Sequence, residues 1–412
     1  MAPRFFVFEF ITGGGLLADT EAPAGSLLTE GQAMLDAVVS DLASGGAGLS
    51  ADTHGSAQPT VSVLWDHRLP PPYWSGADVC LVRDAAETAE QFARLAAAAD
   101  WTVVIAPEFE GHLKHWCEAV NLGGGRWLGG PMDLVRLAAD KHATAQFLES
   151  CGVPVPAGVA IGPGDAWPDD IGLPAVLKPR FGAGAIGVRR VEAADLLAAI
   201  EAAQCLSDGN TIHTGPLGRP WRLETFWPGL PASVSVLSGP AGAFVLPPTQ
   251  QVLAGESGMQ YQGGRWPLES NLRCRAMQLA ARVIECLHAQ SIGPLGYFGI
   301  DLVLGDAADG SRDAVIEVNP RFTTSYVGLR AASQVNLASV MLHLAADADH
   351  AALTNALGPI VFDGRSRSFR LDGTTVRDLE GGLETQTQPI EPQWVPHRPV
   401  ASTVNGKQEV AR

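Results

Sequence analysis

Three oxygen-bearing side chains lie in two short apolar segments on either side of a turn. The segments read Gly299-Ile300-Asp301-Leu302-Val303 and Ile316-Glu317-Val318-Asn319-Pro320-Arg321, and the turn-rich stretch 305–311 separates them. This pattern predicts two antiparallel strands joined as a hairpin. If the turn centres on Asp309, Asp301 lies opposite Glu317, and Asn319 follows on the same face, opposite Gly299.

Two carboxylates that face each other repel unless a cation or a proton lies between them. The side-chain oxygens of Asp301, Glu317 and Asn319 are hard ligands that suit Mg²⁺, which usually bridges to nucleotide phosphates. The alternative is a solvated strand face with acids of no function, but the apolar neighbours of these residues argue against a fully wet sheet. We therefore expect metal ligands in this hairpin.

A lysine and a glycine-rich loop follow an apolar strand near residue 178. Lys178 ends the strand 175–178, and the loop 181–187 contains Gly182, Gly184 and Gly187. Glycines let backbone N–H groups approach an anion closely, with Lys178 as the neighbouring point charge. Because the loop leads into another strand, it is neither a P-loop nor a dinucleotide fingerprint. A plain hairpin turn is the alternative.

Two further segments carry weaker signals. Lys141 follows Asp140, a good N-cap, in the first turn of a helix expected to end at Gly152, and a lysine there opposes the helix dipole. The strand Leu223-Glu224-Thr225-Phe226-Trp227 ends at a Pro-Gly break, where backbone groups are free to pair with a flat heterocycle. Glu224 is a candidate acceptor for an exocyclic amine. Ordinary exposed side chains are the alternative at both places.

Strands and helices alternate over about the first 125 residues. Strand patterns cover 5–11, 61–64, 79–82 and 102–106, and helical patterns cover 26–42 and 87–99. This alternation predicts a parallel α/β domain over residues 1–125. We expect a small lobe with the glycine loop over 126–220 and a second α+β lobe over 221–345. The remainder, 346–412, is expected to be irregular, and its Pro/Gln/Thr-rich end (386–412) poorly ordered.

Composition excludes several function classes. A formal charge of −16 over 412 residues disfavours a nucleic-acid partner. The apolar stretches are far shorter than the ~20 residues of a membrane helix. Six scattered cysteines without a C-x-x-C pair predict reduced thiols in a cytoplasmic protein, not a disulfide framework or a zinc site. His112 and His115 lie three apart, but no third metal ligand is near.

The order of the candidate segments resembles that of the ATP-grasp superfamily over about residues 130–345. The resemblance implies that Lys141 and Lys178 hold the phosphates of ATP while the glycine loop closes over them. It implies that the adenine lies on the strand residues Glu224, Thr225, Phe226 and Trp227. It further implies that Asp301, Glu317 and Asn319 bind one or two Mg²⁺ ions (or Mn²⁺), and that Arg321 stabilises the transferring phosphoryl group.

The fold implied by the resemblance combines α/β and α+β parts. It is an ATP-grasp fold, in which two β-rich lobes clamp ATP, behind an N-terminal Rossmann-like domain called the pre-ATP-grasp domain. The implied reaction activates a carboxylate as an acyl phosphate and joins it to an amine. Many relatives place an acid for the ribose hydroxyls just after the adenine strand, whereas this sequence has Gly229-Leu230-Pro231-Ala232-Ser233 there.

Four shorter strings are similar to one ATP-grasp branch. They are Phe8-Glu9-Phe10-Ile11-Thr12-Gly13-Gly14-Gly15, Ser26-Leu27-Leu28-x-Glu30-Gly31, Ile105-Ala106-Pro107-Glu108 and Asn319-Pro320-Arg321-Phe322-Thr323-Thr324-Ser325-Tyr326. That branch contains the tyramine–glutamate ligase of methanofuran biosynthesis and bacterial counterparts serving methylofuran formation. The resemblance implies γ-glutamyl transfer onto tyramine or tyrosine. Glu9, Glu30 and Glu108 become candidates for contact with the substrate amine, or else helix-start or surface acids.

Three rival interpretations remain at this point. The first is an ATP-grasp carboxylase or another ligase with the same ATP site. The second is a nucleotide-binding protein without catalytic activity. The third, a Rossmann dehydrogenase, lacks the G-x-G-x-x-G spacing at Gly13-Gly14-Gly15. The expected partners are ATP, a small carboxylic acid and an amine, with no nucleic acid and no membrane, and a homodimer is left open.

Overall fold

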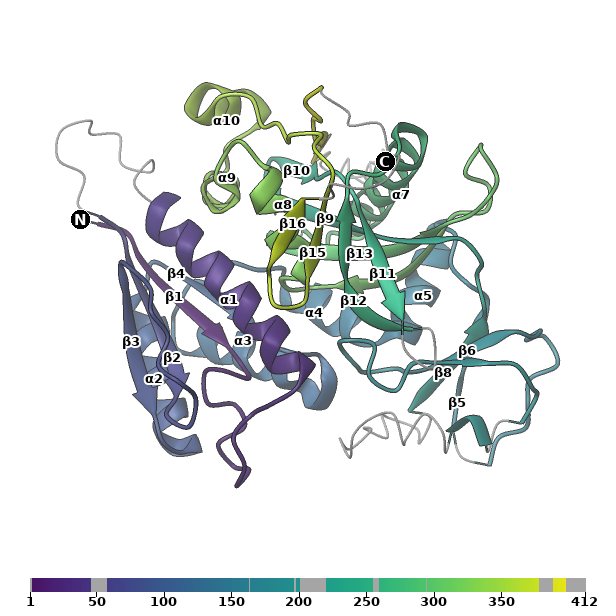
Figure 1. The fold of residues 1–412 in the computed structure, drawn as a ribbon, viewed down its shortest axis with the longest axis horizontal. Helices are drawn as coiled ribbons and strands as arrows, with labels where there is room; N and C mark the ends of the chain where they lie inside the picture. The colour runs from purple at the N-terminus through teal and green to yellow at the C-terminus, as the bar shows by residue number, and fades with distance from the viewer. Residues whose placement is uncertain are drawn as a thin grey trace, which may run out of the picture.

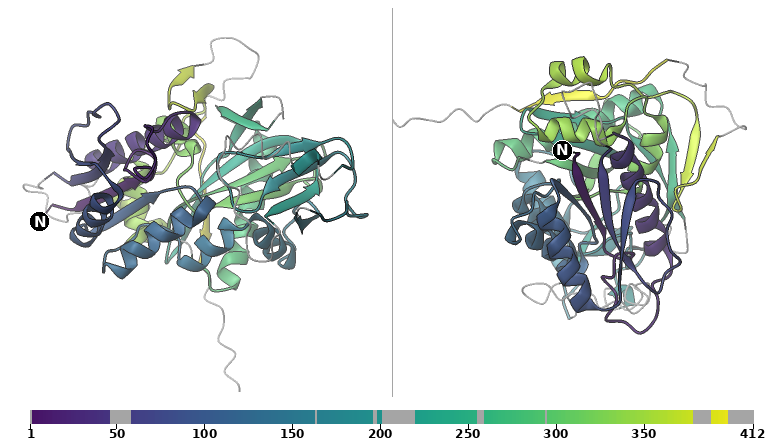
Figure 2. Two further views of the ribbon diagram at one scale, coloured as in Figure 1. Left: turned by 90° about the horizontal axis from the view of Figure 1, so that it is seen from below. Right: turned by 90° about the vertical axis from the view of Figure 1, so that its left-hand side faces the viewer.

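The computed structural model describes residues 2–45, 58–162, 164–195, 198–200, 220–254, 259–293, 295–377 and 388–397. These residues form three β-sheets that lie one after another along the molecule (Figure 1). The N-terminal sheet lies at one end, a large antiparallel sheet in the middle and a small sheet at the other end, and Figure 2 shows the same succession from below. Among the described helices, none is both long and apolar enough to cross a bilayer.

The first sheet is parallel, with the strand order β3-β2-β1-β4. Its strands are β1 (Arg4–Glu9), β2 (Thr60–Asp66), β3 (Ala77–Val82) and β4 (Trp101–Ile105). Its helices are α1 (Ser26–Gly45), α2 (Ala85–Ala98) and α3 (His112–Leu122), with a short 3₁₀ turn, η2 (Phe109–Gly111), before α3. Phe5 and Val7 pack in the cluster under α1, whereas Phe6 and Phe8 pack against α2 and α3. Both faces are therefore buried, as expected for a parallel sheet.

Helix α1 also joins this sheet to the C-terminal part of the chain. Asp41 accepts hydrogen bonds from the Tyr326 hydroxyl at 2.7 Å and from Arg330 Nε at 3.0 Å. Both partners lie on α8 (Thr324–Ala332). Apolar residues of α1 and α8 share one core cluster, so α1 is fixed between the first sheet and the middle of the molecule.

The small sheet has the order β5-β8-β6-β7 and is antiparallel. Its strands are β5 (Gly158–Ile161), β6 (Ala175–Pro179), β7 (Arg189–Val191) and β8 (Trp221–Thr225), and the preceding helices are α4 (Met132–Ala139) and α5 (Lys141–Ser150). The predicted N-cap is confirmed, since Asp140 accepts from the backbone N–H groups of His142 and Ala143. Arg180 also pairs with Asp140, which fixes the start of α5 beside the end of β6. Helix α4 was not predicted from the sequence.

The large sheet carries the predicted hairpin. Its path is β14-β13-β9-β11-β12-β15-β16, with β10 and β17 branching from β9. The strands of its main body are β9 (Leu230–Gly239), β10 (Gly242–Val245), β11 (Thr249–Ala254), β12 (Gln260–Trp266), β13 (Gly296–Leu304) and β14 (Ala314–Asn319). Phe298, Ile300 and Leu302 face the core under α7 (Ser270–Ala289). Because side chains alternate along a strand, Asp301 points to the opposite face.

The C-terminal segment departs from the expectation of an irregular, poorly ordered tail. Helix α9 (Leu337–Ala345) lies just before this segment, which itself contains α10 (His350–Leu357), β15 (Arg367–Arg370), β16 (Thr375–Arg377) and β17 (Gln393–Pro396). Strand β17 pairs with β10, and Ile390 bridges to Phe362. Ile390 and Val395 are each only 5% exposed, and their burial explains why the part 388–397 is ordered. Residues 398–412 lie outside the described residues.

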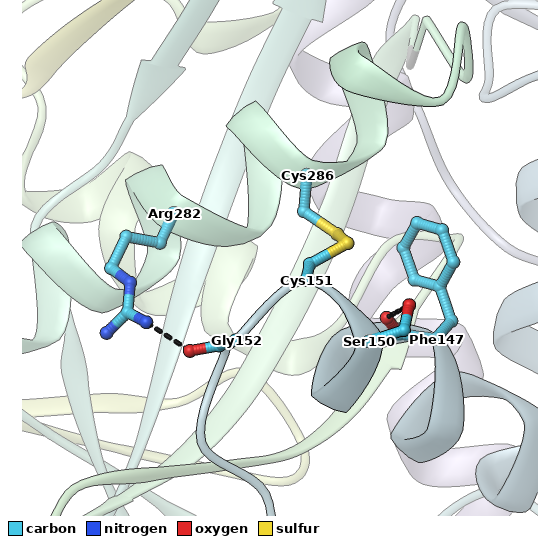
Figure 3. Close-up of a disulfide and its surroundings, with 6 residues drawn as sticks. All are labelled: Phe147, Ser150, Cys151, Gly152, Arg282 and Cys286. Carbon is cyan, nitrogen blue, oxygen red and sulfur yellow. Dashed lines mark hydrogen bonds between the residues drawn. A yellow bond between two sulfur atoms is a disulfide. The ribbon is translucent and has the colours of Figure 1, made fainter.

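The prediction that all cysteines are reduced thiols was wrong for one pair. Cys151, just after α5, forms a disulfide with Cys286 on α7 (Figure 3). The two residues are 135 positions apart in sequence, but the fold brings their Cα atoms to 6.0 Å. Sequence spacing cannot report such proximity. Cys80, Cys117 and Cys274 are free, and Cys205 lies outside the described residues.

Reduction of this disulfide is expected to destabilise the fold by about 2–4 kcal/mol, because the bond limits the unfolded chain. Thermal unfolding with and without dithiothreitol measures the effect. Cys286→Ser should lower the midpoint as reduction does, whereas Cys274→Ser, on the exposed side of the same helix, should leave it unchanged. Equal midpoints for the oxidised and reduced protein would contradict this role of the bond.

Candidate active site

The β13–β14 hairpin has the predicted register. Asp301 pairs with Glu317 and Gly299 with Asn319, with a bulge only after Asp301. Asn319 Nδ2 donates to Asp301 Oδ2 at 3.0 Å. The three predicted metal ligands therefore share one face of the hairpin, as the alternation of the sequence required.

The two facing carboxylates have opposite electrostatic surroundings. Burial and the neighbouring Glu317 raise the pKa of Asp301. Burial also acts to raise the pKa of Glu317, but the Lys141 and Lys178 ammonium groups outweigh it and hold this pKa below its usual range. Lys141 Nζ lies 2.7 Å from Glu317 Oε2 and donates to Gly182 O at 2.9 Å. The charge of Glu317 is thus balanced by cations of the chain, whereas the charge of Asp301 is not.

The residues on this face suit a divalent cation. Their donors are the carboxylate and amide oxygens that Mg²⁺ prefers, and a cation would relieve the repulsion between the two acids. Over the described residues, no group of three or more His, Cys, Asp or Glu side chains could hold a metal by itself.

Lys178 is almost fully buried, at 3% exposure, at the end of β6. Its ammonium lies 2.6 Å from Glu224 Oε1 and donates to Ile316 O at 3.3 Å. The second oxygen of Glu224 accepts from Arg222 Nε at 2.6 Å. Both oxygens of Glu224 are therefore engaged by cations of the chain. The sequence could not show this, because β6 and β8 become neighbours only in the folded sheet. The contact of Glu224 with an exocyclic amine stays a prediction.

The glycine loop lies between β6 and β7. Gly184 and Gly187 have left-handed φ values of 65° and 72°, which glycine adopts without strain. A Cβ placed on Gly184 would lie 3.2 Å from Leu27 Cδ2 of α1, so the loop reaches across to the N-terminal domain. Gly187, at the end of the loop, is buried.

One cavity of about 720 Å³ collects most of the predicted site residues. Its wall contains Lys141, Lys178, Gly182, Gly184, Glu224, Thr225, Phe226, Trp227, Asp301, Glu317, Asn319 and Arg321. Of the predicted nucleotide- and metal-binding residues, Gly187 alone is not in the wall. The Phe226 ring packs under the Arg190 guanidinium, whose Cζ lies 4.3 Å from the ring centroid. The cavity therefore joins an aromatic side to a side with two lysines and two acids.

Arg321 is held by a residue from the N-terminal domain. Its Nε donates to Glu108 Oε1 at 2.9 Å and its Nη2 to Glu108 Oε2 at 3.2 Å. Glu108 is 3% exposed. Glu108 was a candidate contact for a substrate amine, but its carboxylate already receives this two-point contact. Its observed partner is Arg321, so Glu108 fixes the position of a guanidinium that lines the cavity.

Glu9 also departs from the expected contact with an amine. Its carboxylate accepts from the backbone N–H groups of Ile11 and Thr12 and from the Thr12 hydroxyl, which closes the turn after β1. Burial raises its pKa to about 7 despite these bonds. Of the three candidate acids, only Glu30 lies in the cavity wall.

Glu108→Ala is expected to lower the free energy of unfolding by about 3 kcal/mol, because it leaves the buried Arg321 guanidinium without its partner. Urea unfolding measures this loss. Glu118→Ala is the matched control, since Glu118 makes only exposed ion pairs with Lys114 and Arg136 and should cost less than about 1 kcal/mol. Similar losses in the two variants would contradict a special role of the Glu108–Arg321 pair.

Several residues of the cavity wall were not predicted from the sequence to belong to the site. They are Ser233, Gln251, Tyr261, Thr323, Thr324 and Ser325. Ser233 faces Asp301 across β9 and β13, and its side chain hydrogen-bonds that carboxylate. Thr323, Thr324 and Ser325 follow Arg321 after one intervening residue, Phe322, and this polar run after a candidate catalytic residue was a signal in the sequence. Nothing in the local sequence marked Gln251 or Tyr261.

Two family models match adjoining parts of the chain. Residues 138–325 match the ATP-grasp domain and residues 60–135 match the pre-ATP-grasp 3 domain, so together the models cover more than half of the chain. No curated protein sequence matches the chain.

Solved structures show the same fold over most of the chain. An ATP-grasp superfamily protein from Archaeoglobus fulgidus is similar at 18% identity and a TM-score of 0.60, over 90% of this chain and 92% of that chain. A biotin carboxylase complex from Campylobacter jejuni has 15% identity and a TM-score of 0.62, over 89% and 75%. An L-amino acid ligase from Bacillus licheniformis has 15% identity and a TM-score of 0.57, over 89% and 79%.

The predicted fold is thus confirmed as an ATP-grasp fold with a pre-ATP-grasp domain in front of it. Enzymes with this domain use ATP and Mg²⁺ for ligation, and the hairpin acids and the lysines of the cavity suit both ligands. The chain is a member of the ATP-grasp superfamily of ATP-dependent ligases.

Proposed function

We propose that this enzyme activates a carboxylate as an acyl phosphate and joins it to an amine, with glutamate and either tyramine or tyrosine as its substrates, in methylofuran-type cofactor formation. The observation that carries the ligase reaction is the cavity itself. Two buried lysines and an arginine lie there beside a facing pair of carboxylates. The choice of substrates rests on the sequence resemblance to the tyramine–glutamate ligase branch.

Each part of the wall takes one role in this proposal. Lys141 and Lys178 hold the phosphates, and the glycine loop closes over them. The adenine lies on the linker 225–227, with the Phe226 ring and backbone groups as its contacts, because the Glu224 carboxylate is already paired with two cations. Asp301, Glu317 and Asn319 would hold Mg²⁺, which supplies positive charge to the phosphate oxygens when bound.

The reaction then needs two steps. A carboxylate oxygen of the substrate bonds to the γ-phosphorus as the bond to the bridging oxygen of ADP breaks. The amine nitrogen next attacks the acyl carbon, the carbon–oxygen bond to phosphate breaks, and the nitrogen loses a proton. Arg321 and the two lysines stabilise the charge that develops on the phosphoryl group. The loop excludes water, which would otherwise hydrolyse the acyl phosphate.

A panel of substrates scored by ADP release tests this proposal. Glutamate with tyramine or tyrosine should stimulate ADP release, and the amide product should appear in equal amount. Stimulation by bicarbonate instead would support the carboxylase alternative. No ADP release with any acid and amine would favour a nucleotide-binding protein without catalysis.

A further inference from the structure

Glu30 differs from every other acid discussed at this site. It lies on α1, from the N-terminal domain, and its side chain is in the cavity wall together with Met34 one turn later. The acids Glu108, Glu224 and Glu317 are each paired with a cation of the chain. Asp301 has no such cation, but its carboxylate is hydrogen-bonded by Asn319 and Ser233. Within the described part of the chain, Glu30 makes no comparable ion pair or hydrogen bond.

The lysines and the arginine of the cavity wall named above are already engaged. Arg321 acts on Glu30 electrostatically, but its guanidinium is bound at two points by Glu108. Lys141 is bound to Glu317. Burial raises the pKa of Glu30 to about 7 in spite of Arg321. A partly buried carboxylate without a partner costs free energy, and a cation brought by a ligand would compensate that cost.

The surroundings of Glu30 select an organic cation rather than a metal ion. Met34 and Tyr261 are close by, and the Tyr261 side chain hydrogen-bonds Thr324. A hard metal ion would require several oxygen ligands at this point, whereas Met34 offers a thioether and Tyr261 a single phenol oxygen. An ammonium group needs one carboxylate and tolerates an apolar and aromatic wall.

The position of Glu30 is set by the fold rather than by a mobile segment. Asp41 holds the same helix to Tyr326 and Arg330 of α8. Gly31 allows α1 to pass close to Glu9, because a Cβ there would lie 2.6 Å from Glu9 Oε1. The N-terminal domain thus presents one carboxylate to a cavity formed otherwise by the ATP-grasp domain.

We propose that Glu30 binds the ammonium group of one of the two ligated substrates, so that the pre-ATP-grasp domain selects a positively charged amino compound. This inference rests on the proposed ligase function and adds the substrate class that the cavity recognises. The ammonium belongs either to an amino-acid carboxylate donor or to the amine acceptor. Both sources present the same chemistry to Glu30.

Calorimetric titration of the full chain saturated with MgADP separates these sources. The probes are glutamate against glutarate, and tyramine against tyrosol, in which a hydroxyl replaces the amine. In the wild type, at least one ammonium-bearing probe should bind at least ten times more tightly than its analogue. The pair that shows the preference identifies the source of the ammonium.

Glu30→Gln keeps the size of the side chain and removes its charge, and it should reduce that preference to less than twofold. The matched control is Glu90→Gln on α2, which removes the same charge from an exposed position and should keep the preference. A preference that survives in Glu30→Gln would overturn the inference, and so would equal binding within both probe pairs in the wild type. Failure of the wild type to bind MgADP would instead contradict the proposed function.

Discussion

Lys178→Met is expected to lower ADP release at least a hundredfold. Lys178 is buried, and its ammonium lies between β8 and β14, where it faces the cavity beside Glu317. A fixed positive charge in a site that excludes water stabilises the charge on a transferring phosphoryl group far more than an exposed charge does. Removal of one such group costs roughly 10²–10³ in rate. Steady-state ADP release with saturating ATP, glutamate and tyramine measures the effect.

Two controls separate this effect from a loss of folding. Glu224 keeps Arg222 as a partner in Lys178→Met, so the buried carboxylate is not left alone. Circular dichroism should therefore show a folded variant. Lys114→Met removes an exposed lysine of α3 that forms a surface ion pair with Glu118, and it should keep its activity. A folded Lys178→Met variant with turnover within threefold of the wild type would contradict the role assigned to Lys178.

Glu317→Gln is expected to abolish turnover to a similar extent and to remove its dependence on Mg²⁺. Glu317 contacts Lys141 and faces Asp301, so its charge links the phosphate-binding lysines to the metal ligands. The amide keeps the size of the side chain but is a weaker ligand for a hard cation. A titration of ADP release against Mg²⁺ concentration should show a saturable rise in the wild type and a flat, low response in the variant.

Asp306→Asn provides the control on the same hairpin. Asp306 is exposed in the turn and pairs only with exposed Arg312. It should keep both the rate and the Mg²⁺ response of the wild type. If Glu317→Gln kept the Mg²⁺ response of the wild type while Asp306→Asn lost it, the metal site would have to lie elsewhere.

The parts of the site that local sequence determines were predicted well. The register of Asp301 and Glu317 followed from the short connection between two strands, because a hairpin fixes its own pairing within about twenty residues. The parallel first sheet followed from the alternation of strand and helix patterns. The start of α5 at Asp140, and with it the position of Lys141, followed from capping.

The contacts that were missed join residues far apart in sequence. Glu108 and Arg321 are 213 positions apart, and neither segment contains a signal for the other. The disulfide and the pairing of β17 with β10 are of the same kind. In each case, tertiary packing decides the partner, and hydrophobic periodicity reports only the face that a strand or helix buries. A single sequence therefore predicts secondary-structure elements better than it predicts which elements pack together.

A crystal structure with Mg²⁺ and a non-hydrolysable ATP analogue tests the central claim most directly. The account predicts that Lys141 and Lys178 contact the phosphates, that Asp301 and Glu317 ligate the metal, and that the adenine lies against residues 225–227. A nucleotide bound outside this cavity, or a metal bound on the phosphates without either carboxylate, would contradict it.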